Sequence, residues 1–233
     1  MDRVLDAEEF HAQAVLNAIE GFIDEFDDRG EIATVREILQ KDYKDLRSGI
    51  VGQKAELFTE KNLILPTLHA LGYDPDEITA QPAELVPDER SRPDFRIEGV
   101  HKACVCIVEA KRFGNLSGSS DSENIAEKEL QEYLSENALV KYKRDLNVKY
   151  LVGIAADGIR WSLYVKNLES GEQKGIEQYS LAETFETAAF ARQFPNQVDE
   201  KWNIEHRWEI RDGFIPKLAA PKLTNRIDEA IND

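Results

Sequence analysis

Cysteines and long apolar runs are both scarce in this 233-residue sequence, and each absence excludes a class of protein. Cys104 and Cys106 are the two cysteines; residues two apart on a strand share a face but make poor disulfide partners. No second cysteine pair is present to complete a zinc site. No apolar run approaches the ~20 residues that cross a bilayer, and the segment from Met1 to Asp6 lacks the features of a signal peptide. We therefore expect a cytoplasmic protein with reduced thiols and no membrane partner.

Positive charge is also in short supply. The 29 lysines and arginines face 45 aspartates and glutamates, which gives a formal net charge of −16. This balance excludes a protein that coats nucleic acid through a generally basic surface, although it leaves room for a local basic groove. The sequence also has no G-x-x-x-x-G-K-[S/T] and no G-x-G-x-x-G motif, which excludes a nucleotide-driven motor in this chain.

Helical periodicity is clearest in the first third of the chain. Residues 8–28 predict an amphipathic helix that ends near Gly30. Its apolar positions are Phe10, Ala14, Ile19, Phe22 and Phe26. A second helix is predicted over 31–46, followed by a break over 48–52. A third helix is predicted over 54–71, with Leu57 on its apolar face and Pro66 as a kink or division.

Strand patterns dominate the middle of the chain. Residues 93–97 alternate in character and 103–108 form a continuous apolar run, so these two segments predict a hairpin. A second hairpin is predicted from 150–156 and 161–165, because Asp157-Gly158 between them is a strong turn signal. Further helices are expected over 123–137 and 181–194, and a last one after Pro221. This order favours an α/β sandwich over a repeating βαβ barrel.

Two carboxylates and a lysine mark the ends of the first two predicted strands. Asp94 opens one strand, and Glu109 and Lys111 close the next on a shared face. If the strands pair, these three side chains meet at one edge of the sheet. Carboxylates are ligands that Mg²⁺ prefers, and the carbonyl of Ala110 is a further candidate ligand. A metal there would activate water, and Lys111 could orient that water or stabilise charge on a phosphate.

An acid-x-lysine triplet is common by chance and usually lies on a solvated strand. Here it ends a fully apolar strand and follows Pro93-Asp94 at a suitable distance, which favours a functional site. A glycoside hydrolase with paired carboxylates is a weaker alternative, because Lys111 lies two residues from Glu109 and no aromatic sugar platform lies near the motif.

Pro93-Asp94 followed by Glu109-Ala110-Lys111 resembles the motif of the PD-(D/E)xK nuclease superfamily, which includes many restriction endonucleases. The segment 56–74 resembles the first core helix in the N-terminal nuclease domain of type I restriction motor subunits, with its E-x-x-T, L-I-x-P and L-G-Y-D pattern. The resemblance covers roughly Lys54 to Val165. It implies an αβββαβ sandwich, a mixed central sheet flanked by helices, over residues 51–195. Residues 1–50 would then be an N-terminal helical extension and 196–233 a C-terminal extension.

The resemblance also implies an activity, namely Mg²⁺- or Mn²⁺-dependent hydrolysis of DNA in a restriction or defence system. Glu56, Asp94, Glu109 and Lys111 would be the catalytic residues. Asp94, Glu109, Glu56 and the Ala110 carbonyl would hold the metal. Glu60 is an alternative to Glu56, since four residues along a helix return to the same face. Other restriction subunits or a second copy of the chain are further partners that the resemblance implies.

One feature departs from the family pattern. Relatives often carry Q-x-x-x-Y on the helix after the third strand, but here Glu129 precedes Tyr133. This departure and the acidic composition favour an alternative function, that of a catalytically inactive nuclease-fold module that binds protein or nucleic acid. A further set of basic residues could flank the site and hold phosphates; it comprises Lys111, Arg112, Lys141, Lys143, Arg144 and Lys149.

Overall fold

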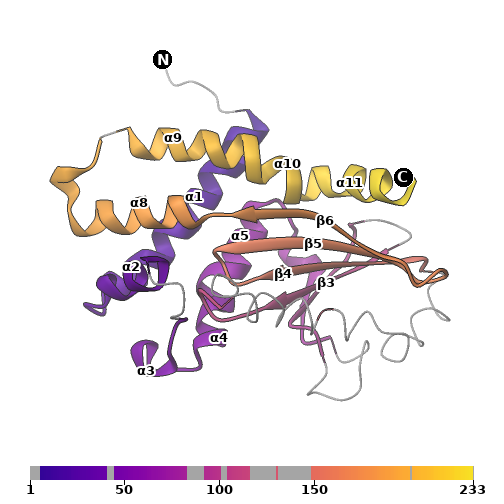
Figure 1. Ribbon diagram of the computed structural model, residues 1–233, viewed down its shortest axis with the longest axis horizontal. Coiled ribbons are helices and arrows are strands. Elements are labelled where there is room, and N and C mark those ends of the chain that lie inside the picture. The colour runs from indigo at the N-terminus through magenta and orange to yellow at the C-terminus, as the bar shows by residue number, and fades with distance from the viewer. Residues whose placement is uncertain are drawn as a thin grey trace.

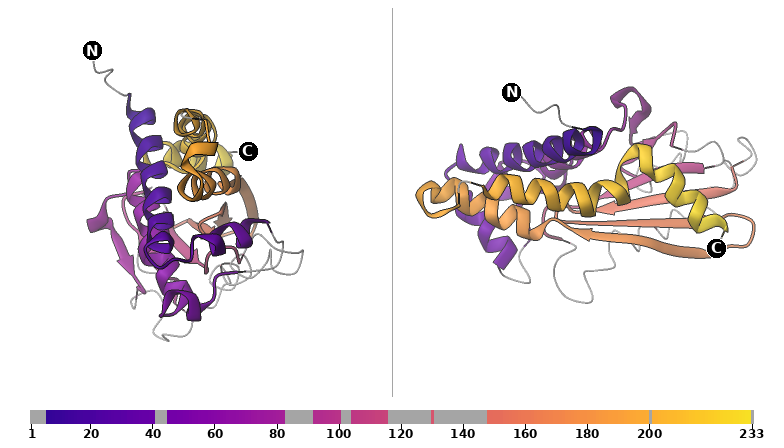
Figure 2. Two further views of the ribbon diagram at one scale, coloured as in Figure 1. Left: turned by 90° about the vertical axis from the view of Figure 1, so that its left-hand side faces the viewer. Right: turned by 90° about the horizontal axis from the view of Figure 1, so that it is seen from above.

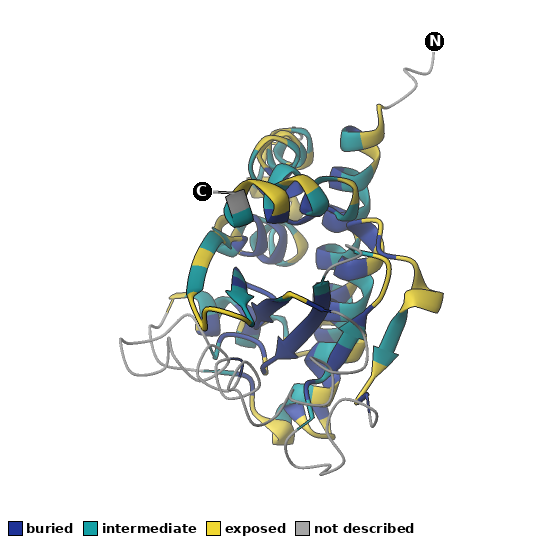
Figure 3. Ribbon diagram, turned by 90° about the vertical axis from the view of Figure 1, so that its right-hand side faces the viewer, coloured by how far each residue is buried: buried dark blue, intermediate teal, exposed yellow. Residues whose placement is uncertain are grey.

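The computed structural model describes residues 6–40, 45–82, 92–100, 104–115, 130, 148–199 and 201–232. These residues form one mixed β-sheet with helices packed against it, so the predicted α/β class is confirmed (Figure 1). Buried residues gather on the strands and on the inner faces of the helices (Figure 3). None of the helices in the described residues has both the length and the apolar character of a membrane span.

In the part of the chain that the structure describes, the sheet contains six strands in their sequence order. The strands are β1 (Ile78–Ala80), β2 (Phe95–Ile97), β3 (Cys104–Ala110), β4 (Tyr150–Ala156), β5 (Arg160–Asn167) and β6 (Gln173–Ser180). Only β3 and β4 run parallel, and every other neighbouring pair is antiparallel. Both predicted hairpins, β2–β3 and β4–β5, are therefore confirmed.

The β4–β5 turn is fixed by the two residues that signalled it. Gly158 has a φ of +87°, which a glycine adopts without steric cost. The buried Asp157 accepts hydrogen bonds through Oδ1 from the backbone N–H groups of Ile159 (2.9 Å) and Arg160 (2.7 Å). The turn therefore holds β4 and β5 in register.

β6, the edge strand that pairs with β5, was not predicted. Its sequence, Gln173 to Ser180, is polar, and the described structure leaves its residues half-buried or exposed. Its order comes from backbone pairing along β5 and from α11, which contacts both strands.

The first helix, α1 (Ala7–Asp27), confirms the prediction over 8–28 and supplies the centre of the core. Phe22 is fully buried and packs against Phe58, Phe113 and Phe185. Phe10 was placed on the apolar face and is instead 62% exposed, because it lies off the side of the helix on which Glu9 and Ala12 are buried. One hydrophobic cluster joins residues from all three predicted segments, 1–50, 51–195 and 196–233.

The helix predicted over 54–71 forms in three parts, α4 (Ala55–Thr59), η1 (Glu60–Ile64) and α5 (Leu65–Ala70). η1 is a turn of π-helix that precedes Pro66, so the irregularity begins earlier than the proline predicted. Such turns insert one residue into a helix and are frequent at functional sites. Leu57, predicted on the apolar face, is 49% exposed.

The remaining helices cover the N-terminal helix and the sheet. They are α2 (Ile32–Gln40), α3 (Ser48–Val51), α8 (Ala182–Gln193), α9 (Trp202–Glu209), η5 (Ile210–Phe214), α10 (Ile215–Leu218) and α11 (Ala220–Asn232), with short turns η2 (Pro75–Glu77) and η4 (Pro195–Gln197). α8 and α9 lie beside α1 (Figure 2). The prediction over 31–46 was too long, since residues 45 and 46 are not helical, and the predicted break over 48–52 contains α3.

Candidate metal site and catalytic lysine

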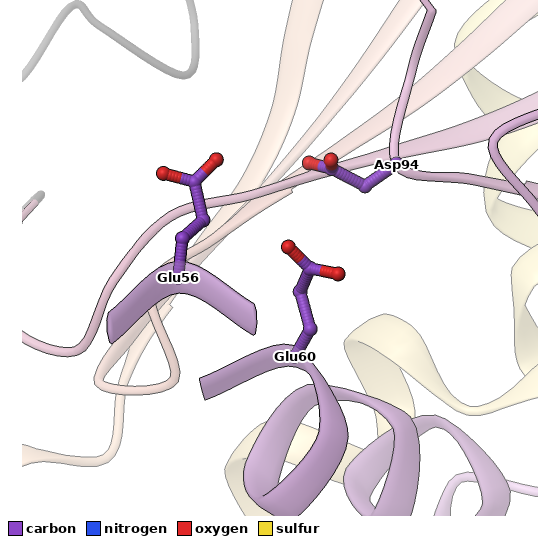
Figure 4. Close-up of side chains that lie close together, drawn as sticks. All are labelled: Glu56, Glu60 and Asp94. Atoms are coloured by element: carbon purple, nitrogen blue, oxygen red, sulfur yellow. The ribbon is translucent and has the colours of Figure 1, made fainter. Parts of the chain in front are cut away.

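Glu56 and Glu60 lie one helical turn apart, at the junction between α4 and η1. The Glu60 N–H donates to the Glu56 carbonyl, which keeps the α-helical spacing up to the start of the π turn. Both side chains therefore project from the same side of the helix (Figure 4). The sequence offered these two residues as alternatives, and the structure brings both to the site.

Asp94 approaches the two glutamates from the sheet, immediately before β2 (Figure 4). Its Oδ2 accepts a 2.7 Å hydrogen bond from the Ala110 N–H at the end of β3. Its backbone carbonyl accepts a 2.8 Å hydrogen bond from the Gln81 N–H, just after β1. Asp94 is thus tied to the strands on both sides of β2.

The carboxylates of Glu56, Glu60 and Asp94 gather with one oxygen from each lying within 4.8 Å of the others. Oxygen ligands of an octahedral Mg²⁺ are about 3 Å apart when they are neighbours and about 4.2 Å apart when they are opposite, so the three carboxylates would have to move closer together to hold one ion, with water and substrate oxygens filling the other positions. Hard oxygen donors from three carboxylates also fit Mg²⁺ or Mn²⁺ better than zinc, which favours nitrogen and sulfur. The residues present therefore fit the expected ion.

Burial raises the pKa of two carboxyl groups in this cluster, Asp94 and Glu60. It raises the pKa of Asp94 to about 7, opposed by the Ala110 N–H and assisted by the nearby Glu60. Burial also raises the pKa of Glu60, with a further contribution from Glu56 and an opposing one from Lys111. A divalent cation would favour the charged forms of all three groups.

Lys111 reaches the edge of the same cluster. Its backbone N–H donates to the Ala156 carbonyl at 2.8 Å and extends the β3–β4 pairing by one residue. Its Nζ lies 2.6 Å from Glu109 Oε1 and 3.7 Å from Glu56 Oε1, while its side chain is 8% exposed. The ammonium is therefore held between two carboxylates from different elements.

Glu109 occupies a different position from the three gathered carboxylates. It pairs with Ala155 in β4, its side chain is only 3% exposed, and it accepts the hydrogen bond from Lys111. The Glu109 carboxylate thus acts here as a partner of the lysine, and its predicted role as a metal ligand stays a prediction. Ala110 meets the site through its N–H, and its carbonyl as a ligand likewise stays a prediction.

The turn after β3 is anchored to the helix that carries the glutamates. The Phe113 N–H donates to Thr59 Oγ1 at 3.0 Å, and the Thr59 hydroxyl donates to the Ala55 carbonyl at 2.9 Å. The Phe113 ring packs against Phe22 and Phe185. The core thereby fixes the distance between the lysine and the helix glutamates. Thr59 is the threonine of E-x-x-T, and this positioning role was not predicted.

The cluster opens into a cavity of about 720 Å³. The cavity is lined by Ser48, Lys54, Ala55, Glu56, Leu57, Glu60, Gln81, Asp94, Lys111, Arg112 and Asn115. Gln81 has a φ of +44°, the only positive φ outside glycine among the described residues. Such a conformation is uncommon for a non-glycine residue, and no sequence pattern indicated it.

Several predicted residues lie outside the described residues. They are the helix over 123–137 apart from Leu130, and with it Glu129 and Tyr133, together with Lys141, Lys143 and Arg144.

Comparison with protein-family models, with curated proteins and with solved structures found no match in any of the three.

Proposed function

We propose that this protein is a Mg²⁺-dependent nuclease that hydrolyses phosphodiester bonds of DNA. On this proposal it is a PD-(D/E)xK nuclease that serves in a restriction or defence system, and Mn²⁺ can replace Mg²⁺. One observation carries the proposal: Glu56, Glu60 and Asp94 converge within 4.8 Å beside the buried Lys111, on the wall of a cavity.

The charge of the cavity favours an anionic substrate. The chain as a whole has many more acidic than basic residues, yet the residues lining the cavity include three of each sign, with Lys54, Lys111 and Arg112 supplying the cations. A bound divalent ion would leave this lining with a net positive charge. A phosphodiester, and not a neutral sugar, is the substrate that such a lining attracts.

Each protein group has a definite task in this proposal. Glu56, Glu60 and Asp94 would hold the ion, which lowers the pKa of a bound water and neutralises charge developing on the phosphate. Lys111 donates a hydrogen bond to the attacking water or to a phosphate oxygen. Glu109 accepts a 2.6 Å hydrogen bond from the lysine Nζ and so fixes the position of this group beside the cluster.

The arrangement of strands is consistent with the αβββαβ core that the sequence resemblance implies. The helix α4–α5 precedes three antiparallel strands, β1 to β3, and β4 then runs parallel to β3. A parallel neighbour needs a crossover connection. Leu130, from the predicted crossover helix, lies directly over Gly153 on β4, where even a Cβ atom would clash with it.

The decisive experiment combines plasmid cleavage in Mg²⁺ with metal titration calorimetry. We expect Asp94→Asn and Glu60→Gln to lose metal binding and cleavage together. Lys111→Met should bind metal but cut on the order of 100-fold more slowly, because a donor to the developing charge is gone. Glu25→Gln removes a carboxylate from an exposed ion pair on α1 and should behave as the wild type.

Equal cleavage by the wild type and all three site variants would contradict the proposal. A folded wild-type protein that binds neither Mg²⁺ nor Mn²⁺ would also contradict it, and would favour the non-catalytic binding module.

A further inference from the structure

Arg112 lines the same cavity as Lys111, and its guanidinium forms an ion pair with Asp45. The Arg112 Nε lies 2.7 Å from Asp45 Oδ2, and Asn115 Nδ2 donates to the same oxygen at 3.2 Å. Arg112 and Asn115 line the cavity, whereas Asp45 is not among its lining residues. The aspartate therefore anchors two hydrogen-bond donors at the cavity wall.

The segment that carries Asp45 is itself fixed to the turn after β3. The Leu46 N–H donates to the Phe113 carbonyl at 2.9 Å, and the Leu46 side chain is fully buried. Arg112 lies between Lys111 and Phe113 in that turn. Its guanidinium is thus restrained by its own backbone and by Asp45, which reduces the entropy that it would lose on binding a ligand.

A guanidinium has five N–H groups in a planar fork, so one that bonds an aspartate through Nε has its two Nη groups to offer to a second anion. Arginine forks match phosphate oxygens in geometry as well as charge. Asn115 adds a neutral donor at the same wall. The set has the chemistry of a phosphate site that is separate from the carboxylate cluster.

We propose that Arg112 and Asn115, with Asp45 as a positioning residue, bind a phosphate of the nucleic-acid strand next to the phosphate that is cleaved. The proposal rests on the proposed function, because it assigns the second phosphate of the same substrate. The subsite fixes the strand in the cavity and leaves the chemistry to Lys111 and the three carboxylates.

The test measures binding separately from cleavage. The probe is a fluorescent single-stranded oligodeoxythymidine, titrated by anisotropy over a series of salt concentrations. Ca²⁺ replaces Mg²⁺ as an oxygen-ligated divalent ion, and a gel checks that the oligonucleotide stays intact. Plasmid cleavage in Mg²⁺ is measured in parallel on the same proteins.

Arg112→Met should weaken oligonucleotide binding about fivefold at about 0.1 M salt, and should reduce the slope of log K against log salt by about 0.7, as the loss of one phosphate contact to a single strand requires. Arg112→Lys keeps the charge but not the fork, so we expect the wild-type slope with weaker binding.

Arg192 offers a matched control. Its Nε lies 2.8 Å from Asp27 Oδ2 and its side chain is 47% exposed, against 2.7 Å and 46% for Arg112, but it lies away from this cavity. Arg192→Met should bind the oligonucleotide as the wild type does.

Each outcome separates this subsite from the proposed function. If Arg112→Met and Arg192→Met bind alike while plasmid is cut, the subsite is overturned and the nuclease proposal stands. If Arg112→Met binds more weakly but no protein cuts plasmid, the subsite stands and the cleavage activity is overturned. A wild-type protein that binds no oligonucleotide overturns the subsite, and it overturns the nuclease proposal as well if it cuts no plasmid.

Discussion

Two acidic regions on this protein have similar composition and opposite electrostatic designs. At the metal site, Glu56, Glu60 and Asp94 point toward one another, and burial raises the pKa of Asp94 to about 7. At the C-terminal end of α1, oxygens of Asp24 and Asp27 instead lie 3.0 and 2.8 Å from the guanidinium of the exposed Arg192.

The second region also lines a cavity, of about 330 Å³, with Glu20, Asp24 and Arg192 among its lining residues. There Asp24 and Asp27 pair with Arg192 at the surface and raise its pKa. At the metal site the nearest lysine is buried and already bonded to Glu109. Convergence of partly buried carboxylates, and not their number, is what distinguishes a candidate cation site from an ordinary surface ion pair.

The largest contrast should come from neutralising one aspartate in each region. In the metal-free protein, Asp94→Asn should increase the free energy of unfolding at pH 8 by on the order of 2–4 kcal/mol, since it removes a charge that burial disfavours and keeps an acceptor for Ala110. Asp24→Asn should lower it by about 0–1 kcal/mol, as expected for a surface ion pair. Urea denaturation measures both.

The pH dependence of that effect has a defined sign. The folded-state pKa of Asp94 is about 7, above the unfolded value of about 3.9. Its protonated form therefore stabilises the fold at low pH, and this contribution is lost as the pH rises toward 7. The advantage of Asp94→Asn should be near zero below about pH 4 and full above about pH 7. If Asp94→Asn is less stable than the wild type at pH 8, burial does not disfavour the charged form of this carboxylate.

Metal addition should sharpen the contrast by a somewhat smaller amount. An ion at 100 times its dissociation constant adds about 2.7 kcal/mol to the free energy of unfolding. We expect Mg²⁺ to stabilise the wild type and Asp24→Asn alike, and to leave Asp94→Asn unchanged. The stabilisation should be larger at pH 8 than at pH 6, because protons compete for Asp94. Thermal unfolding with Mg²⁺ and with a chelator measures the difference.

An equal gain in Asp94→Asn would place the ion outside the carboxylate cluster. The proposed metal site would then be wrong, whatever the plasmid assay shows.

Much of the fold, and part of the candidate site, could be predicted from the sequence where local pattern decides the structure. Period-two and continuous apolar runs gave β2 to β5, and Asp157-Gly158 gave the turn between β4 and β5. The four-residue spacing of Glu56 and Glu60 gave their common face. These features depend on residues close together in the chain, so a single sequence contains the relevant information.

Features that depend on distant packing could not be predicted. The periodicity of α1 gives it an apolar face but does not say that Phe22 packs against Phe58, Phe113 and Phe185. β6 has a polar sequence and gains its order by pairing with β5. Glu109 pairs with Lys111, and Glu60 is among the three gathered carboxylates. Both outcomes depend on how the helix and the strands are placed relative to one another.

The smallest expected effect concerns the backbone at Gln81. This residue has a φ of +44° beside Asp94, whereas the described residues around the second cavity have no positive φ outside glycine. Glycine adopts this conformation without steric cost, and this gain exceeds the extra entropy that glycine loses on folding. Gln81→Gly should therefore raise the free energy of unfolding by about 1 kcal/mol. Gln81→Ala keeps the unfavourable φ and should give no gain. Urea denaturation of the two variants separates the backbone conformation from the side chain. If Gln81→Gly is less stable than the wild type, the contacts of the glutamine side chain stabilise the end of β1 by more than the positive φ costs. If the gain is found, the metal-site region combines a disfavoured backbone with disfavoured charges. In the Arg192 region burial raises the pKa of Glu20, but no described non-glycine residue around that cavity has a positive φ.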